Sequence, residues 1–421
     1  MTDVEFIKAP APGGAAEDGR IAETVRGVIA AVAAEGDAAV RRFAAEFDGS
    51  DAERFEVSAE EREDAVARLD PQTRADTEFA IANVRAFAEA QRGAIADLDV
   101  EIRPGVHLGH RNVPLARVGC YVPGGRYPLL SAPVMTIVPA RVAGVGEVVA
   151  CLPPGAQEAM VAGCDLAGAD RIFRIGGAQA IAAMALGTGS VPRVDKIVGP
   201  GNAYVNEAKR QVFGPVGIDQ LAGPSEIFVL ADETGDAATI ATDLLAQAEH
   251  DPRTRVGLIT THRPLAHAVL AEVEAQLATL STADVARRAW EDRGEIALVP
   301  DRDAMRAYSD AVAAEHLQVH VADAEGYART LTGYGSLFVG ELASVVYSDK
   351  CCGTNHTLPT MGAARYTGGL WVGSYLKTVT HQRLTPEGVR AVAPPAVRQS
   401  ASEGLEGHRR AAQLRLDRLN A

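Results

Sequence analysis

Short apolar runs alternate with longer segments of helical spacing through the middle of the chain. Each run is rich in β-branched residues and has the length of a buried strand. The predicted strands are 118–122, 148–152, 171–175, 196–198 and 227–230, and the predicted helices between them are 132–143, 156–167, 178–186 and 203–213. Such alternation is typical of a parallel sheet covered by helices, so we predict a doubly wound α/β domain over residues 119–232.

The same alternation continues further along the chain. Strands are predicted at 256–260, 296–299 and 336–339, with helices around 265–280 and 303–313. A second α/β domain is therefore expected over residues 233–368.

Both flanks of these domains favour helices. Residues 21–47 have apolar positions at helical spacing, helices rich in Ala, Glu and Arg continue to about residue 96, and 100–110 alternates like a strand or hairpin arm. We predict that the helical region 1–118 packs on the second α/β domain. In 369–421, the prolines at 386, 394 and 395 indicate a flexible join before a final helix at 400–420, which would dock across a dimer.

Composition narrows the class of protein. With 421 residues, 47% of them hydrophobic, the chain is long enough for several folded domains. A net charge of −14 argues against nucleic acid or an anionic membrane as the main partner. No stretch of 18 apolar residues or basic leader occurs, and the five cysteines suit a reducing compartment, so we expect a cytoplasmic protein.

Four glycine-bearing loops lie near the predicted strands of residues 119–232. They are 122–126, 176–179, 199–202 and 222–226. Glycine lets backbone N–H groups approach a phosphate, and a following helix N-terminus favours its charge. Each loop alone is also explained as a tight turn, and no G-x-G-x-x-G fingerprint is present. Four together predict a ligand that bears phosphate.

Polar side chains suggest a metal and an acid–base pair. Gln247 and His250 are three residues apart on a predicted helix, so they share a face that could hold a metal ion, although a hydrogen-bonded structural histidine is the simpler explanation of this stretch alone. Glu315 and His316 could divide two proton transfers between them, or be placed there by chance. The polar loop 347–360 is either functional or merely exposed, and its Cys351-Cys352 pair is either reactive or packed.

Taken together, eight ordered blocks resemble the histidinol dehydrogenase family over nearly the whole chain. They are 119–125 (GCYVPGG), 176–179 (GGAQ), 197–202 (IVGPGN), 222–226 (AGPSE), 247–250 (QAEH), 315–317 (EHL), 353–360 (GTNHTLPT) and 403–408 (EGLEGH). The resemblance implies two incomplete Rossmann-like domains in an intertwined homodimer. It also implies an alcohol dehydrogenase that depends on zinc and NAD.

The resemblance also assigns residues to roles. It implies Gln247, His250, Asp349 and His408 as zinc ligands, with His408 reaching the metal of the neighbouring subunit. Tyr121, Gln179 and Asn202 match positions that contact NAD. The positions that contact substrate are Ser225, His316 and Glu403 together with the four metal ligands.

The implied reaction oxidises a primary alcohol through an aldehyde to a carboxylate and reduces two NAD in sequence. His316 would take the alcohol proton, and Glu315 would activate the water that adds to the aldehyde. L-histidinol, which would yield L-histidine, is the first candidate substrate. A zinc hydrolase that works without NAD and a dimeric binding protein without catalysis are remoter alternatives.

Three segments depart from the histidinol pattern and look more like a branch of the family that oxidises 2,3-dihydroxypropane-1-sulfonate to sulfolactate. They are 126–131 (RYPLLS), 348–350 (SDK) and 369–380 (GLWVGSYLKTVT), whereas 222–226 looks like the histidinol branch. Arg126, Lys350 and Lys377 could supply positive charge for an anionic substrate, or bind the NAD phosphates or a surface carboxylate. The substrate therefore stays open between these small polar alcohols.

Overall fold

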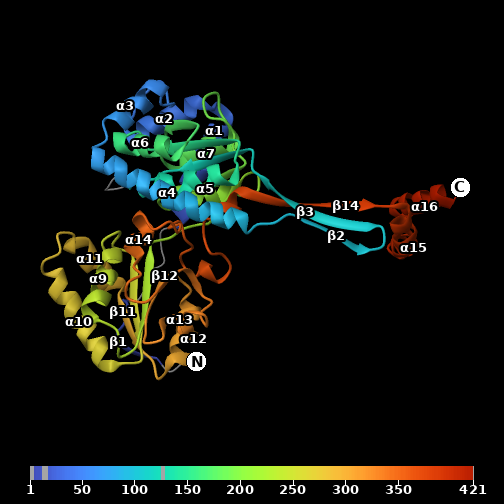
Figure 1. Ribbon diagram of the computed structural model, residues 1–421. Coiled ribbons are helices and arrows are strands. Elements are labelled where there is room, and N and C mark those ends of the chain that lie inside the picture. Colours follow the sequence, from blue (N-terminus) through green and yellow to red (C-terminus); the bar gives the residue numbers. More distant parts are fainter. Residues whose placement is uncertain (1–3, 12–17, 125–128, 421) are drawn as a thin grey trace.

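The computed structural model describes residues 4–11, 18–124 and 129–420. The chain forms two α/β bodies, one around a five-stranded sheet and one around a six-stranded sheet, and a long arm that extends away from both (Figure 1). The α/β fold class with parallel sheets is confirmed.

The five-stranded sheet is entirely parallel, as the alternating pattern predicts. Its strand order is β6-β5-β4-β7-β8. The strands are β4 (Arg117–Tyr121), β5 (Glu147–Leu152), β6 (Arg171–Arg174), β7 (Lys196–Val198) and β8 (Gly217–Ile218), and the helices between them are α5 (Ser131–Ala143), α6 (Glu158–Ala167), α7 (Gly177–Leu186) and α8 (Ala203–Val212). The central strands are buried because helices cover both faces.

The six-stranded sheet has the order β1-β11-β10-β9-β12-β13, with only the edge strand β1 antiparallel. Its strands are β1 (Glu5–Lys8), β9 (Glu226–Ala231), β10 (Arg255–Thr260), β11 (Glu295–Leu298), β12 (Ala314–His320) and β13 (Tyr334–Val339). Its helices are α9 (Ala237–Ala248), α10 (Arg263–Leu277), α11 (Ala283–Arg293), α12 (Arg302–Val312), α13 (Ala324–Ala328) and α14 (Val345–Lys350).

The boundary predicted at residue 232 differs from the structure. Strand β9 pairs with β10 and β12, so it lies at the centre of the six-stranded sheet rather than in the first body. An apolar run predicts a buried strand without saying which sheet buries it. The segment 219–225, between β8 and β9, is therefore one of the links between the bodies.

The N-terminal helices also pack differently from the prediction. Helices α1 (Asp18–Glu35), α2 (Asp37–Asp48), α3 (Ala59–Ala67) and α4 (Pro71–Gly93) pack on the five-stranded body, whereas strand β1 joins the sheet of the second body. Val25, Val28 and Val32 of α1 are buried in the same core as α7. Helical spacing shows that a helix has an apolar face, but only the tertiary fold decides what covers it.

The arm contains a three-stranded antiparallel sheet in the order β14-β3-β2, and of the two forms predicted for 100–110, a strand or a hairpin arm, the structure has the hairpin. Its elements are β2 (Leu98–Arg103), β3 (Val106–Pro114), β14 (Leu376–Leu384), α15 (Pro386–Ser402) and α16 (Glu406–Asn420), and the two helices form its tip (Figure 1). The prediction of a flexible join at the three prolines is wrong, because all three lie within α15. Pro386 occupies the first turn of α15, where no N–H is needed, and Pro394 and Pro395 lie inside that helix.

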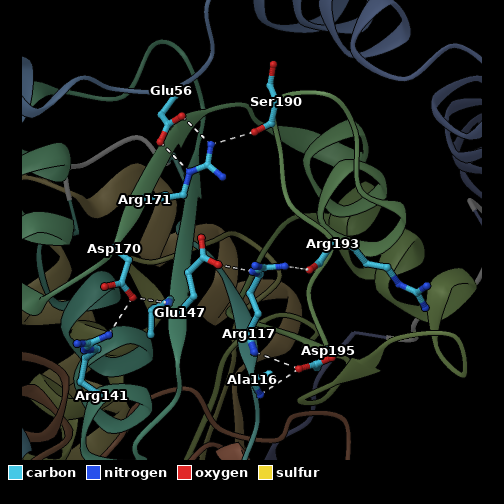
Figure 2. A network of polar contacts seen from close by, with 11 residues as sticks. Glu56, Ala116, Arg117, Arg141, Glu147, Asp170, Arg171, Ser190, Arg193 and Asp195 are labelled. Atoms are coloured by element: carbon cyan, nitrogen blue, oxygen red, sulfur yellow. Dashed lines mark hydrogen bonds and ion pairs between the residues drawn. The ribbon is translucent and has the colours of Figure 1, made fainter.

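Ion pairs close the amino edge of the five-stranded sheet (Figure 2). Arg117 pairs with Glu147 at the start of β4 and β5, and the Arg171 guanidinium donates twice to Glu56, at 2.7 Å for each bond. Asp195 accepts from the backbone N–H of Arg117 at 3.0 Å. This edge therefore carries structural contacts.

Candidate active site

The opposite, carboxyl edge of the five-stranded sheet is hollowed into a cavity of about 550 Å³. Residues from β4, α7 and the start of α8 meet there with the middle of α1 and the end of α2. Its lining includes Tyr121, Gln179 and Asn202, together with Thr24, Val28, Glu46, Phe47, Asp48, Gly124, Pro153, Gly177, Ala178 and Tyr204. The structure thus brings the three positions predicted to contact NAD into one cavity.

At the floor of this cavity, backbone N–H groups donate hydrogen bonds to side chains. The N–H of Gly177 donates to Tyr121 Oη at 3.1 Å, and the N–H of Gly176 donates to the Asp48 carboxylate. Gln179 Nε2 also donates to Asp48 Oδ2 at 2.9 Å. Burial raises the pKa of Tyr121 to about 12, so the phenol keeps its proton and can donate.

Asn202 closes the next turn by capping α8. Its Oδ1 accepts from the N–H groups of Tyr204 at 3.0 Å and of Val205 at 3.1 Å. Beneath it, the fully buried Lys209 pairs with Asp219 and donates to the Gly199 carbonyl at 3.0 Å. These contacts hold the glycine turn at 199–201 in place.

The second group of predicted residues lies on the six-stranded sheet, at its amino edge. Glu315 and His316 are buried at the start of β12, beside the start of β9. Glu315 Oε2 accepts from Ser225 Oγ at 2.6 Å and from the Glu226 N–H at 2.8 Å. The His316 Nδ1 atom lies 2.9 Å from the Glu226 carbonyl oxygen and 3.4 Å from Glu315 Oε2.

These contacts set the charge and the direction of His316. Burial lowers its pKa, but the Glu315 charge and hydrogen bond, the Asp349 charge and the Glu226 carbonyl outweigh burial and raise the pKa to about 9. The other ring nitrogen, Nε2, is buried and has no hydrogen-bond partner among the described residues. A buried nitrogen without a partner is a natural point of contact for a substrate or a metal.

Two more predicted residues lie beside this pair. Gln247 Nε2, on α9, donates to Ser225 Oγ, and Asp349, on α14, is close enough to influence the His316 pKa. Residue-by-residue prediction missed His356, whose Nδ1 lies 3.9 Å from Asp349 Oδ1. Burial lowers its pKa. Two signals in the sequence included it, namely the polar loop 347–360 and the block 353–360 of the family resemblance.

The four predicted zinc ligands do not meet within one chain. No group of three or more His, Cys, Asp and Glu side chains in the described parts could hold a metal. His250 follows the end of α9, while Glu403 and His408 are exposed at the arm tip (Figure 1). Gln247 and Asp349, both buried, supply an amide oxygen and a carboxylate, which are donor types that suit zinc, so the residues present fit part of a zinc site.

Comparison with known proteins settles the family. The model of the family described as histidinol dehydrogenase matches residues 13–416. The chain belongs to the histidinol dehydrogenase family. Members of this family are dehydrogenases, so the protein is an oxidoreductase.

Relatives in the histidinol dehydrogenase family differ in their named substrates. A histidinol dehydrogenase homolog of Shouchella clausii is 49% identical over 403 residues, with 95% of each chain covered. Sulfopropanediol 3-dehydrogenase of Ruegeria pomeroyi is 44% identical over 423 residues, which cover 98% of this chain and 96% of that one. The crystal structure of histidinol dehydrogenase from Elizabethkingia anophelis matches with a TM-score of 0.92 at 33% identity, covering 98% of this chain and 95% of the other.

Two of the three cationic side chains in the departing segments lie in the described parts of the chain. Lys350 lines a shallow pocket with Asp76 and Leu129, and Lys377 is exposed on β14 of the arm. Arg126 lies outside the described residues.

The adjacent cysteines differ in exposure, since Cys351 is half-buried and Cys352 is exposed. None of the helices in the described ranges is long and apolar enough to span a membrane.

Proposed function

We propose that the protein is a zinc- and NAD-dependent alcohol dehydrogenase that oxidises a primary alcohol, through a bound aldehyde, to a carboxylate. Two NAD would be reduced per substrate, and L-histidinol is the first candidate. The observation that carries the proposal is the buried Glu315–His316 pair, in which His316 Nε2 has no hydrogen-bond partner among the described residues. The membership of the chain in the histidinol dehydrogenase family supports it. A buried acid beside a buried imidazole is suited to proton transfer.

His316 would act as the base for the alcohol proton. The Glu226 carbonyl can only accept a hydrogen bond, so it favours the tautomer in which Nδ1 carries the proton and Nε2 keeps its lone pair. In the neutral ring, the lone pair on Nε2 can take a proton. The imidazolium that forms is then stabilised by Glu315 and Asp349.

Glu315 would activate the water that adds to the aldehyde. Ser225 and the Glu226 N–H hold one oxygen of its carboxylate, which orients the group against β9. Burial of the pair keeps bulk water away from the aldehyde, so the intermediate is protected from side reactions.

The cofactors would be held on the two bodies. Tyr121, Gln179 and Asn202 would contact NAD in the cavity of the five-stranded sheet, and NAD, when bound, supplies the hydride acceptor. Gln247, His250 and Asp349 would hold zinc together with His408 of a second copy of the chain, and zinc, when bound, polarises the alcohol oxygen. The position of Glu403 and His408 at the arm tip supports a homodimer with shared sites. We expect this dimer to work in the cytoplasm.

A sulfonated diol is the alternative substrate. The relative named sulfopropanediol 3-dehydrogenase and the three departing segments favour 2,3-dihydroxypropane-1-sulfonate, which would be oxidised to sulfolactate. Histidinol can offer its imidazole to zinc, whereas a diol offers a hydroxyl oxygen, and the donor set suits both.

The experiment is NADH formation by the zinc-loaded protein with each alcohol supplied separately and the products quantified. Two NADH per histidine formed would establish the histidinol reaction, and a preference for the sulfonate would assign the alternative. Turnover of neither, with NADH still bound, would point to a third alcohol. Failure to bind NADH at all would overturn the proposal and favour a zinc hydrolase.

A further inference from the structure

In the cavity of the five-stranded sheet, hydrogen-bond acceptors lie where the sequence predicts backbone N–H groups that donate to a phosphate. The N–H groups of Gly176 and Gly177, at the N-terminus of α7, already donate to Asp48 and to Tyr121. A carboxylate thus occupies the place in which a helix N-terminus would otherwise bind an anion. The floor of the cavity is therefore unsuited to a phosphate.

A second acceptor lies beside Asp48. Gln179 is 1% exposed, and its Oε1 has no hydrogen-bond partner among the described residues. The assignment of its amide is determined by the neighbour, because Nε2 can donate to Asp48 whereas Oε1 would be repelled by the carboxylate. Two oxygen acceptors side by side call for a ligand with two O–H donors, and a vicinal diol is such a group.

The side chains at the rim of the cavity indicate that the diol belongs to a nucleoside. Phe47 is 50% exposed and Tyr204 is 45% exposed, and both rings line the same cavity. Exposed aromatic faces beside a polar floor are suited to stacking a base whose ribose reaches inwards.

None of the residues that line the cavity belongs to the six-stranded body, which carries the acid–base pair. It is lined by residues of α1, α2, β4 and α7 and of the start of α8. In contrast, α4 and α5 contact the loop after α14, where Asn83 donates to the Cys351 carbonyl at 2.8 Å and Asn355 donates to the Met135 carbonyl at 2.7 Å. The half of a dinucleotide that does not react therefore fits here.

We propose that Asp48 binds the adenosine ribose diol and thereby selects NAD over NADP. This inference rests on the proposed function, since it specifies the cofactor of the same site. A carboxylate accepts hydrogen bonds from both hydroxyls of NAD, whereas the 2′-phosphate of NADP removes one donor and places like charges together.

The experiment measures equilibrium binding by calorimetry, without turnover. Full-length protein is titrated with ADP-ribose and with 2′-phospho-ADP-ribose, and the wild type should bind the first at least tenfold more tightly. Asp48→Asn should weaken ADP-ribose binding about tenfold and leave the phosphorylated ligand unchanged or tighter. Glu46→Gln removes a charge from the same cavity wall and should preserve the wild-type ratio.

Equal binding of both ligands by the wild type would overturn the inference even if Asp48→Asn did not fold. An unchanged ratio in folded Asp48→Asn, or an equal change in Glu46→Gln, would also overturn it, because general charge would then explain the preference. Each of these results leaves the proposed NAD dependence intact. Absence of binding by NAD, NADH and ADP-ribose would instead defeat the proposed function together with this inference.

Discussion

The two parallel sheets use opposite edges. The five-stranded sheet has its cavity at the carboxyl ends of the strands, while Arg117 and Arg171 pair with carboxylates at its amino edge (Figure 2). In the six-stranded sheet, Glu315 and His316 lie at the amino ends, and at the carboxyl edge Asp232 pairs with Arg302. Ligands of open α/β sheets commonly lie at the carboxyl ends of the strands, and the predicted site residues lie at those ends in one sheet of this protein but at the amino ends in the other.

Chain continuity explains the difference. The seven-residue segment 219–225 joins β8 of the first sheet to the amino end of β9 in the second. The amino edge of the six-stranded sheet must therefore face the first body. Hydrogen bonds from the loop after α14 stabilise the segment 219–225. Gln220 Nε2 donates to the Thr357 carbonyl at 2.9 Å, and Thr360 Oγ1 accepts from the Gly223 N–H.

The largest expected effect is a loss of activity without a loss of NADH binding, which would separate the roles of the two sheet edges. His316→Gln removes the proposed base, so alcohol oxidation should fall about 10²- to 10⁴-fold, whereas NADH binding should change less than about twofold because the cavity is on the other sheet. Steady-state rates measure alcohol oxidation, and fluorescence titrations measure NADH binding. His320→Gln is a matched control at the opposite end of β12 and should retain activity within a few-fold. Equal losses in both variants, or loss of NADH binding, would contradict the separation.

A smaller effect is expected from the cavity of the five-stranded sheet. Tyr121→Phe removes the acceptor for the Gly177 N–H and a donor for the cofactor, so the Kd for NADH should rise about tenfold. At saturating NAD, a single turnover should proceed at nearly the wild-type rate. Tyr308→Phe, a phenol bonded to Glu295 of the other sheet, should leave the Kd unchanged. A slower single turnover in Tyr121→Phe would show that the two edges are not independent.

The smallest effect concerns the titration of His316 in metal-free protein. Its NMR resonance should titrate with a pKa of about 9, and Glu315→Gln should return the midpoint towards the ordinary value of about 6.5. Because the folded-state pKa is raised, the stability from this pair is fully present below about pH 6.5 and is lost as the pH rises through about 9. A wild-type midpoint near 6.5 would refute the assigned coupling between Glu315 and His316.

Local patterns in the sequence determined much of this molecule. Apolar runs with the length of buried strands predicted the parallel sheets, because strands covered on both faces must be apolar throughout. The blocks around Gln179, Ser225 and His316 identified the family and the positions that the structure gathers into two places.

Other features depended on contacts between residues far apart in the chain. The sequence did not place β9 in the second sheet or α1–α4 on the first, because an apolar face can be buried against any apolar partner. It did not bring Asp48 to Gln179, 131 positions away, or His356 to Asp349 through a loop without regular structure. Which edge of each sheet carries a site was likewise decided by tertiary structure, because the short link 219–225 orients one body on the other.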